Sequence, residues 1–166
     1  MRRFLIILAI SCMLAGNAHA IGSGVGPVQI TGLSDLNLGP WGIGDPPLSA
    51  HMDLCIYALV TLPLTSYVIT VSSPSGYVLS NGLRQIPYSL YWDDSGAGNL
   101  GSGSGTQLSN GVALAGQMNA NMLAPDCSLG NAGPNARLTL KITATDMTNA
   151  LAGTYTGTIT LLLSPN

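Results

Sequence analysis

Two segments near the end of the chain alternate between apolar and polar residues with a period of two. Residues 136–144 read ARLTLKITA and residues 154–163 read TYTGTITLLL, with threonine at most polar positions of the second segment. Successive side chains of a β-strand point to opposite faces, so each segment predicts a strand with one buried face and one face in solvent. Threonine is also a good strand former. The chain is therefore expected to be built mainly from strands.

Six further runs have a strand-like composition and are separated by Gly, Pro, Asn and Asp clusters that are typical of turns. They span residues 28–33, 50–58, 67–72, 76–80, 86–92 and 111–118. Asn81-Gly82 is a signal for a type I′ hairpin turn, and one helical turn is expected within 145–150. Seven or eight short strands with frequent turns predict an all-β fold of the immunoglobulin-like β-sandwich type.

The low charge of the chain excludes several classes of protein. Charged residues make up 7% of the 166 residues, against about 25% in an ordinary soluble domain. Coiled coils and helix bundles need charged residues at helical spacing, and nucleic-acid binders need a basic stripe, so neither class fits. A membrane-spanning barrel needs aromatic girdles and strands of about 10 residues. Because the chain is only 5% aromatic and most of its strands are short, no membrane insertion is predicted.

The first twenty residues have the composition of a secretory signal peptide. Two arginines precede the apolar run FLIILAI at 4–10, and the sequence AHA at 18–20 supplies the small residues of a cleavage site. The apolar run is shorter than the ~20 residues that a membrane span needs. Cleavage after Ala20 would leave residues 21–166 as a single exported domain. Lipidation of Cys12 is the alternative, because its surroundings loosely resemble a lipoprotein box.

Two cysteines, Cys55 and Cys127, remain after the predicted cleavage. An even pair in an exported protein predicts a disulfide. Two free thiols, or half of a metal site, are the alternatives. The exported chain has a single histidine, His51, so it contains no standard set of zinc ligands.

No arrangement of catalytic residues is recognisable. His51 lies in an alternating strand without a paired base and nucleophile, which favours a half-exposed structural residue. Asp93, Asp94 and Asn99 could supply oxygens to Ca²⁺, but their spacing does not match an EF-hand loop and the chain has no glutamate. A solvated turn is the preferred interpretation. The sequence therefore predicts a protein that is not an enzyme and that holds no cofactor or metal.

Two features point to an alternative role in ligand binding. Trp41 and Trp92 could stack on a sugar, although such residues more often cap a sandwich core. Residues 94–105 (DSGAGNLGSGSG) predict a long, mobile loop that does not pack. This loop is expected to lie within one domain, because the pieces on either side of it are small for independent sheets. The alternative function is thus a secreted or tip-located adhesin or carbohydrate-binding module.

The final segment is strongly apolar and is expected to leave an open sheet edge. Low charge, export and high β content fit a protein that completes its sandwich with a strand from another chain. That strand is expected to pair with residues 154–163. The inward side chains of this segment are predicted to line the groove that receives it: Tyr155, Ile159, Leu161 and Leu163.

Four stretches of the chain resemble the spore coat protein U-like domain family. They are DLNLG at 35–39, MDLCIY at 52–57, IPYSLYWD at 86–93 and GTYTGTITL at 153–161. They follow the family's order and extend over nearly all of residues 21–166. The family includes the subunits of archaic, Csu-type chaperone–usher pili.

The resemblance implies an incomplete immunoglobulin-like sandwich that lacks one strand. A periplasmic chaperone would lend a strand, and the N-terminal extension of another pilus subunit would replace it at an outer-membrane usher. The chain would pass through the periplasm to a cell-surface fibre for attachment and biofilm formation. Residues 21–26 are shorter and richer in glycine than the donor segment of such pilins, and Gly157 stands where Asp is common. A chain that accepts a strand without donating one would lie at a fibre tip or would not polymerise.

Overall fold

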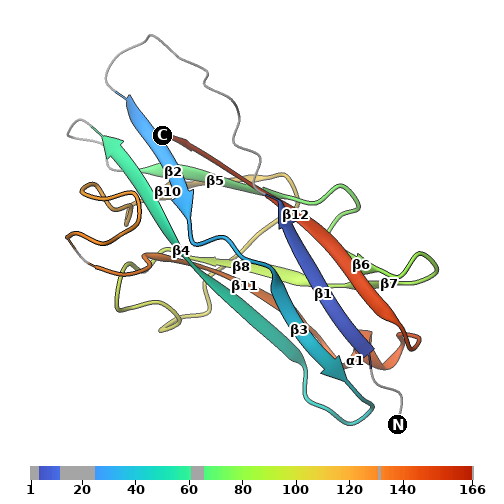
Figure 1. Cartoon of the computed structure of the whole chain (residues 1–166). Coiled ribbons are helices and arrows are strands. Elements are labelled where there is room, and N and C mark those ends of the chain that lie inside the picture. The colour runs from blue at the N-terminus through green and yellow to red at the C-terminus, as the bar shows by residue number, and fades with distance from the viewer. Residues whose placement is uncertain (1–3, 12–24, 61–65, 131, 166) are drawn as a thin grey trace.

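The strands of the chain form two sheets that pack face to face (Figure 1). The computed structural model describes residues 4–11, 25–60, 66–130 and 132–165. The proposed cleavage site at 18–20 and Cys12 lie outside these residues. The strands are β1 (Phe4–Ser11), β2 (Val25–Thr31), β3 (Leu36–Trp41), β4 (Leu48–Val60), β5 (Tyr67–Ser72), β6 (Val78–Ser80), β7 (Gln85–Pro87), β8 (Ser89–Asp93), β9 (Thr106–Gln107), β10 (Ala113–Gln117), β11 (Ala136–Ile142) and β12 (Thr154–Pro165). One short helix, α1 (Ala144–Thr148), lies between β11 and β12.

The two sheets differ in how they are assembled. The first has the order β10-β5-β12-β1-β3, with β6 beside β12 and β7 beside β6. The second has the order β2-β4-β11-β8-β9. The strands pair in antiparallel fashion apart from β1 with β12, which are parallel. The prediction of an all-β sandwich is confirmed. No helix among the described residues is long and apolar enough to cross a membrane.

The core lies between the sheets and takes the apolar face of each alternating strand. In β11, Leu138 and Leu140 are buried, while Thr139 between them faces outward. In β12, Tyr155 and Ile159 are buried in the same way. Burying one such side chain contributes about 1.5–3 kcal/mol. A register slip of one residue would turn every buried side chain outward, so this alternation fixes the pairing.

The segment 86–92, predicted as one strand, is two strands in different sheets. β7 pairs with β6 in the first sheet, and β8 pairs with β11 in the second. Pro87 ends β7, since proline supplies no N–H to a strand ladder. Ile86, Tyr88 and Leu90 are all buried. The inward face therefore continues while the chain crosses between sheets, and for this reason the sequence pattern reads as a single strand.

The turn and helix predictions hold in outline. Asn81-Gly82 lies between the hairpin strands β6 and β7, but the connection is four residues long and not a two-residue turn. The Asn81 side-chain oxygen accepts hydrogen bonds from the N–H groups of Leu83 and Arg84, which closes the longer loop. The expected helical turn is α1, whose N-terminus is capped by the hydroxyl of Thr143.

The predicted disulfide between Cys55 and Cys127 is present, with Cα atoms 5.8 Å apart. It fastens the connection between β10 and β11 to the outside of β4. Buried Asn135 bonds both backbone groups of Ile56 through its side chain, at 2.8 Å each. The backbone N–H of Asn121 also donates to the carbonyl of Ile56, at 2.8 Å. This long connection is therefore held by one covalent bond and a set of asparagine contacts.

Candidate functional site

β1 lies inside the first sheet, between β12 and the edge strand β3, and connects the two. It runs parallel to β12, with Leu5–Ser11 opposite residues 154–160, and antiparallel to β3, opposite residues 36–41. Among the described residues, β3 has no strand partner other than β1. Figure 1 shows β1, in dark blue, between β12 and β3. The continuity of this sheet therefore depends on β1.

β1 consists of residues that the sequence assigns to the signal peptide. Loss of residues 1–20 would separate β12 from β3 and leave two strand edges facing one another. We call the space between residues 154–160 of β12 and residues 36–41 of β3 the acceptor gap. Unpaired N–H and C=O groups along such edges form a template for another strand. The exported chain would thus present a vacant strand position inside the first sheet, next to its edge strand β3.

The inward side chains of β12 that lie beside the acceptor gap are Tyr155 and Ile159, and both are fully buried. The other two residues predicted to line the groove lie farther along the strand. Leu161 is buried and Leu163 partly buried, in the part of β12 that pairs with β5 and not with β1. Thr158 faces outward and is exposed. The structure therefore places two of the four predicted lining residues at the gap.

The second edge of the acceptor gap, β3, is a strand that sequence reasoning missed. Gly39-Pro40 has the composition of a turn, and this region reads as a loop. In the structure Gly39 adopts a φ of +74° at a bulge in the pairing with β1. A positive φ suits glycine. The signal that could have revealed the strand is the alternation of Leu36 and Leu38, which are both buried.

Trp41 and Trp92, predicted as possible ligand contacts, are core residues. Their exposed fractions are 2% and 1%. The indole N–H of Trp41 donates to the carbonyl of Pro46 at 3.0 Å, so this side chain closes one end of β3. Neither tryptophan offers a ring face to a ligand, and the sugar-stacking interpretation is wrong for both.

Asp93 holds the glycine-rich loop 94–105 against the second sheet. Its carboxylate accepts hydrogen bonds from Ser95 and, at 2.7 Å, from the N–H of Gly101. Burial opposes ionisation of this group, but the hydrogen bonds and the charge of Arg137 together lower the pKa of Asp93. The prediction that this loop does not pack is wrong, because composition alone does not reveal the acceptor that anchors it.

Asp94 links the same loop to the first sheet. It accepts a hydrogen bond from the hydroxyl of Tyr67 at 2.6 Å and others from the N–H groups of Met118 and Asn119. Burial raises the pKa of Asp94, and the hydrogen bonds offset this only in part. Burial and the neighbouring Asp94 also raise the pKa of Tyr67. Both aspartates considered as Ca²⁺ ligands are thus engaged by donors of the protein itself.

The described residues contain no group of three or more His, Cys, Asp or Glu side chains that could hold a metal ion. His51 lies exposed on β4, in register with Thr139 of β11. The pairing that the structure shows at the acceptor gap is that of the backbone groups of β12 and β3 with β1.

Comparison with solved structures finds fimbrial proteins of similar fold. One is described as a chaperone–tip adhesin complex that is vital for synergistic activation of CFA/I fimbriae biogenesis, with a TM-score of 0.52 and 23% identity over 84% of this chain and 41% of that chain. Another is a mutant of CfaE, the CFA/I adhesin of enterotoxigenic E. coli, with a TM-score of 0.48 and 18% identity over 72% and 36%. The chain spans less than half the length of each. No protein-family model and no curated protein matches it.

Proposed function

We propose that the chain is a structural subunit of a surface fimbria assembled by the chaperone–usher route, and that a partner's strand completes its sandwich. The observation that carries this proposal is the acceptor gap. Residues 4–11, from the predicted signal peptide, fill the strand position between β12 and β3 that the exported chain would leave vacant. Strand edges without partners cost free energy when they are buried. The exported chain therefore requires a strand from outside.

The partners follow from the order of export. A periplasmic chaperone supplies the first strand, and a neighbouring subunit replaces it at an outer-membrane usher. The resemblance to spore coat protein U-like pilins supports this sequence of events, as does a fold shared with a fimbrial chaperone–adhesin complex. The end point is a cell-surface fibre that serves attachment and biofilm formation.

A position at the fibre tip, as an adhesin, is the second candidate. Under the predicted cleavage after Ala20, four residues precede β2, which begins at Val25 and pairs with β4. The strand that fills the acceptor gap, β1, has eight residues. A four-residue segment is too short to fill a gap of that length in a neighbour. A subunit that accepts a strand without donating one ends the fibre.

Photo-crosslinking in the periplasm tests the acceptor role. A photoreactive amino acid at Thr158, which is exposed and lies opposite Ala9 of β1, is expected to form an adduct with a periplasmic chaperone. The control position is Thr139, which faces outward on the second sheet and is expected to give no adduct. Absence of an adduct at Thr158, or equal adducts at both positions, would contradict the proposal.

A further inference from the structure

The outward face of the second sheet carries an ordered array of polar side chains. The pairings of β11 with β4 and with β8 align these side chains in three rows across the strands. The rows are Asp53-Arg137-Asp93, His51-Thr139-Tyr91 and Ser49-Lys141-Ser89. We call this array the polar face.

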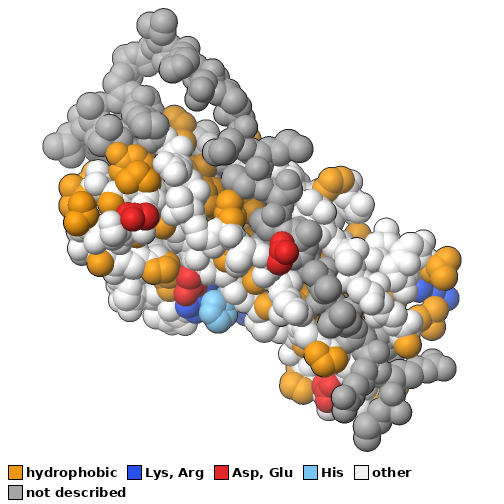
Figure 2. Space-filling model, in the orientation of Figure 1, with side chains coloured by type: hydrophobic (Ala, Val, Ile, Leu, Met, Phe, Trp, Pro, Cys, Tyr) orange, Lys and Arg blue, Asp and Glu red, His pale blue; other side chains and the backbone are white. Residues whose placement is uncertain are grey.

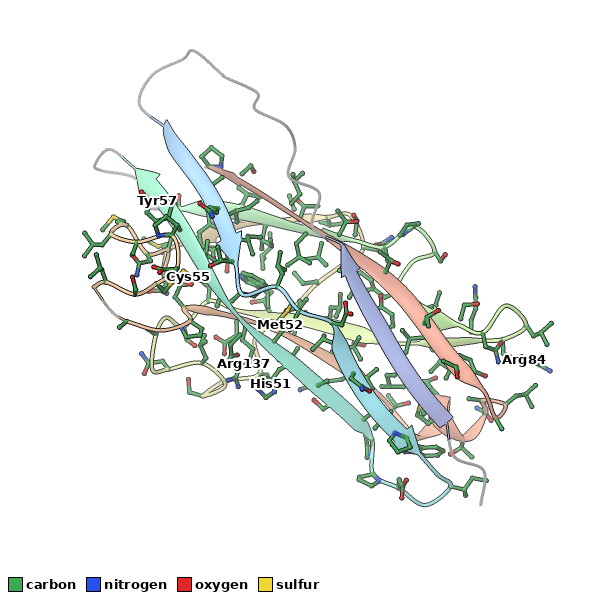
Figure 3. All side chains as sticks on the ribbon, in the orientation of Figure 1. His51, Met52, Cys55, Tyr57, Arg84 and Arg137 are labelled. Carbon is green, nitrogen blue, oxygen red and sulfur yellow. A yellow bond between two sulfur atoms is a disulfide. The ribbon has the colours of Figure 1, made fainter. Side chains whose placement is uncertain are left out.

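The polar face collects most of the cationic side chains of a chain that has few. After the predicted cleavage, the basic residues are Arg84, Arg137 and Lys141, with His51 as the only histidine. Figure 3 places His51 and Arg137 together on the second sheet and Arg84 at the distant β6–β7 turn. Figure 2 shows the histidine beside basic and acidic side chains on one surface. The polar face thus combines two basic side chains, Arg137 and Lys141, with two carboxylates, Asp53 and Asp93.

The charges of the first row are already satisfied. Arg137 binds both carboxylate oxygens of Asp53, with Nε–Oδ1 at 2.5 Å and Nη2–Oδ2 at 2.9 Å. Asp93, in register on its other side, adds a further negative charge. A bidentate pair of this kind is geometrically specific and holds the guanidinium in place. Arg137 is therefore a fixed part of the array.

Lys141 has no such partner. The pair Arg137–Asp53 is the single ion pair among the residues that the structure describes. Lys141 is exposed, and the residues in register on either side of it are serines. Its Nζ lies 4.7 Å from the centroid of the Tyr91 ring, which positions the ammonium group through a cation–π contact without neutralising it. Lys141 thus retains its capacity to bind an anion.

The glycine-rich loop encloses this part of the sheet. Gly101 packs so closely that a Cβ there would lie 2.3 Å from a guanidinium nitrogen of Arg137, and its φ is +79°. The loop and the sheet border a hollow of about 210 Å³, smaller than the ~300–1,000 Å³ of pockets that enclose a drug-sized ligand. Two charged side chains at the hollow, Arg137 and Asp93, are held by Asp53 and by the loop donors Ser95 and Gly101. The remaining side chains there are all polar: Ser49, His51, Tyr91, Ser104, Thr139 and Lys141.

We propose that this hollow binds a carboxylated sugar residue of a glycan. The Lys141 ammonium, with the imidazole of His51 beside it, receives the carboxylate. The hydroxyl groups of Ser49, Ser104 and Thr139 exchange hydrogen bonds with the sugar hydroxyls. An apolar peptide or lipid would find no aliphatic side chain at the hollow. The proposal is independent of the acceptor gap, because it concerns the opposite sheet.

Titration of the purified full chain with glucuronate, followed by NMR, tests this site. The chain is expected to bind glucuronate, and to bind glucose at least tenfold more weakly. The Lys141→Gln variant is expected to lose about tenfold or more in affinity for glucuronate, as expected for a charge-assisted hydrogen bond. The matched control is Arg84→Gln, which makes the same charge change at a distant turn and should alter affinity less than about twofold.

Three results would overturn the proposal. The first is no binding of glucuronate, and the second is equal affinity in the Lys141→Gln and wild-type chains. The third is binding of glutamate as tight as that of glucuronate, which would mean that the sugar hydroxyls contribute nothing. Because β1 fills the acceptor gap in the full chain, these results do not depend on whether a partner strand is ever exchanged.

Discussion

Asp93 and Asp94 are adjacent in the chain and have pKa shifts of opposite direction. Asp93 is the less enclosed of the two, and hydrogen bonds from Ser95 and Gly101 stabilise its charged form. Asp94 is largely buried next to Tyr67, and desolvation destabilises its charged form. Composition identifies this region only as polar loop. The difference between the two carboxyls arises from the packing of sheets that are distant in sequence.

These shifts predict opposite pH dependence for two matched variants. Because its pKa is lowered in the folded chain, Asp93 stabilises the fold at pH values above its unfolded pKa and loses this contribution as the pH falls. Because the pKa of Asp94 is raised, Asp94 contributes most at low pH and loses this contribution as the pH rises. The destabilisation by Asp93→Asn is therefore expected to grow between about pH 3 and pH 7, and that by Asp94→Asn to shrink. Urea unfolding of the full chain at both pH values measures this. Changes in the same direction for both variants would contradict the assignment.

The disulfide gives a second prediction at the residue scale. Cys55 and Cys127 are 72 residues apart, and closing a loop of that length stabilises the fold by about 4 kcal/mol in the loop-entropy model. The double variant Cys55→Ala/Cys127→Ala is expected to lower the free energy of unfolding in urea by about that amount. Cys12→Ala, at a cysteine outside the pair, serves as the control. A double variant as stable as this control would show that the bond contributes nothing.

Elements with strict alternation could be predicted from the sequence, and elements defined by distant contacts could not. β5, β11 and β12 were predicted nearly to the residue because each has one apolar and one polar face. β3 was missed because Gly39-Pro40 looks like a turn. Likewise, Trp41 and Trp92 could be assigned to the core only once the sheets were in place. The pairing partner of β12 was expected to come from another chain, and no local pattern indicates that residues 4–11 fill that position.

The role of β1 as an element predicts the effect of a single proline. Leu8 lies between Gly157 of β12 and Leu36 of β3, and proline is excluded from central strands because it has no N–H to donate. In the full chain, Leu8→Pro is expected to open the acceptor gap and cause association. Leu14→Pro, in the predicted leader but outside β1, is the control.

Sedimentation velocity distinguishes the outcomes. The wild-type full chain and Leu14→Pro are expected to be monomeric. Leu8→Pro and the chain 21–166 are both expected to associate. A monomeric Leu8→Pro chain would mean that β1 is not needed to cover the two edges.

At the scale of the whole molecule, removal of residues 1–20 would combine a vacant strand position with a surface that opposes association only weakly. Charge is low, and several large apolar side chains are exposed, including Met118, Leu123 and Leu129 in the connection between β10 and β11. Low net charge and exposed apolar groups favour association with other chains. Under the proposed function, such a molecule would depend on a partner both to complete its fold and to remain soluble.

Hydrogen–deuterium exchange of the chain 21–166, with and without a periplasmic chaperone, tests the central claim most directly. If the partner's strand enters the acceptor gap, amides in residues 36–41 and 154–160 should exchange slowly in the complex and quickly in the released chain, because strand pairing protects backbone N–H groups. Equal exchange of both segments in the two samples, with new protection at another edge such as β2 or β9, would contradict the account.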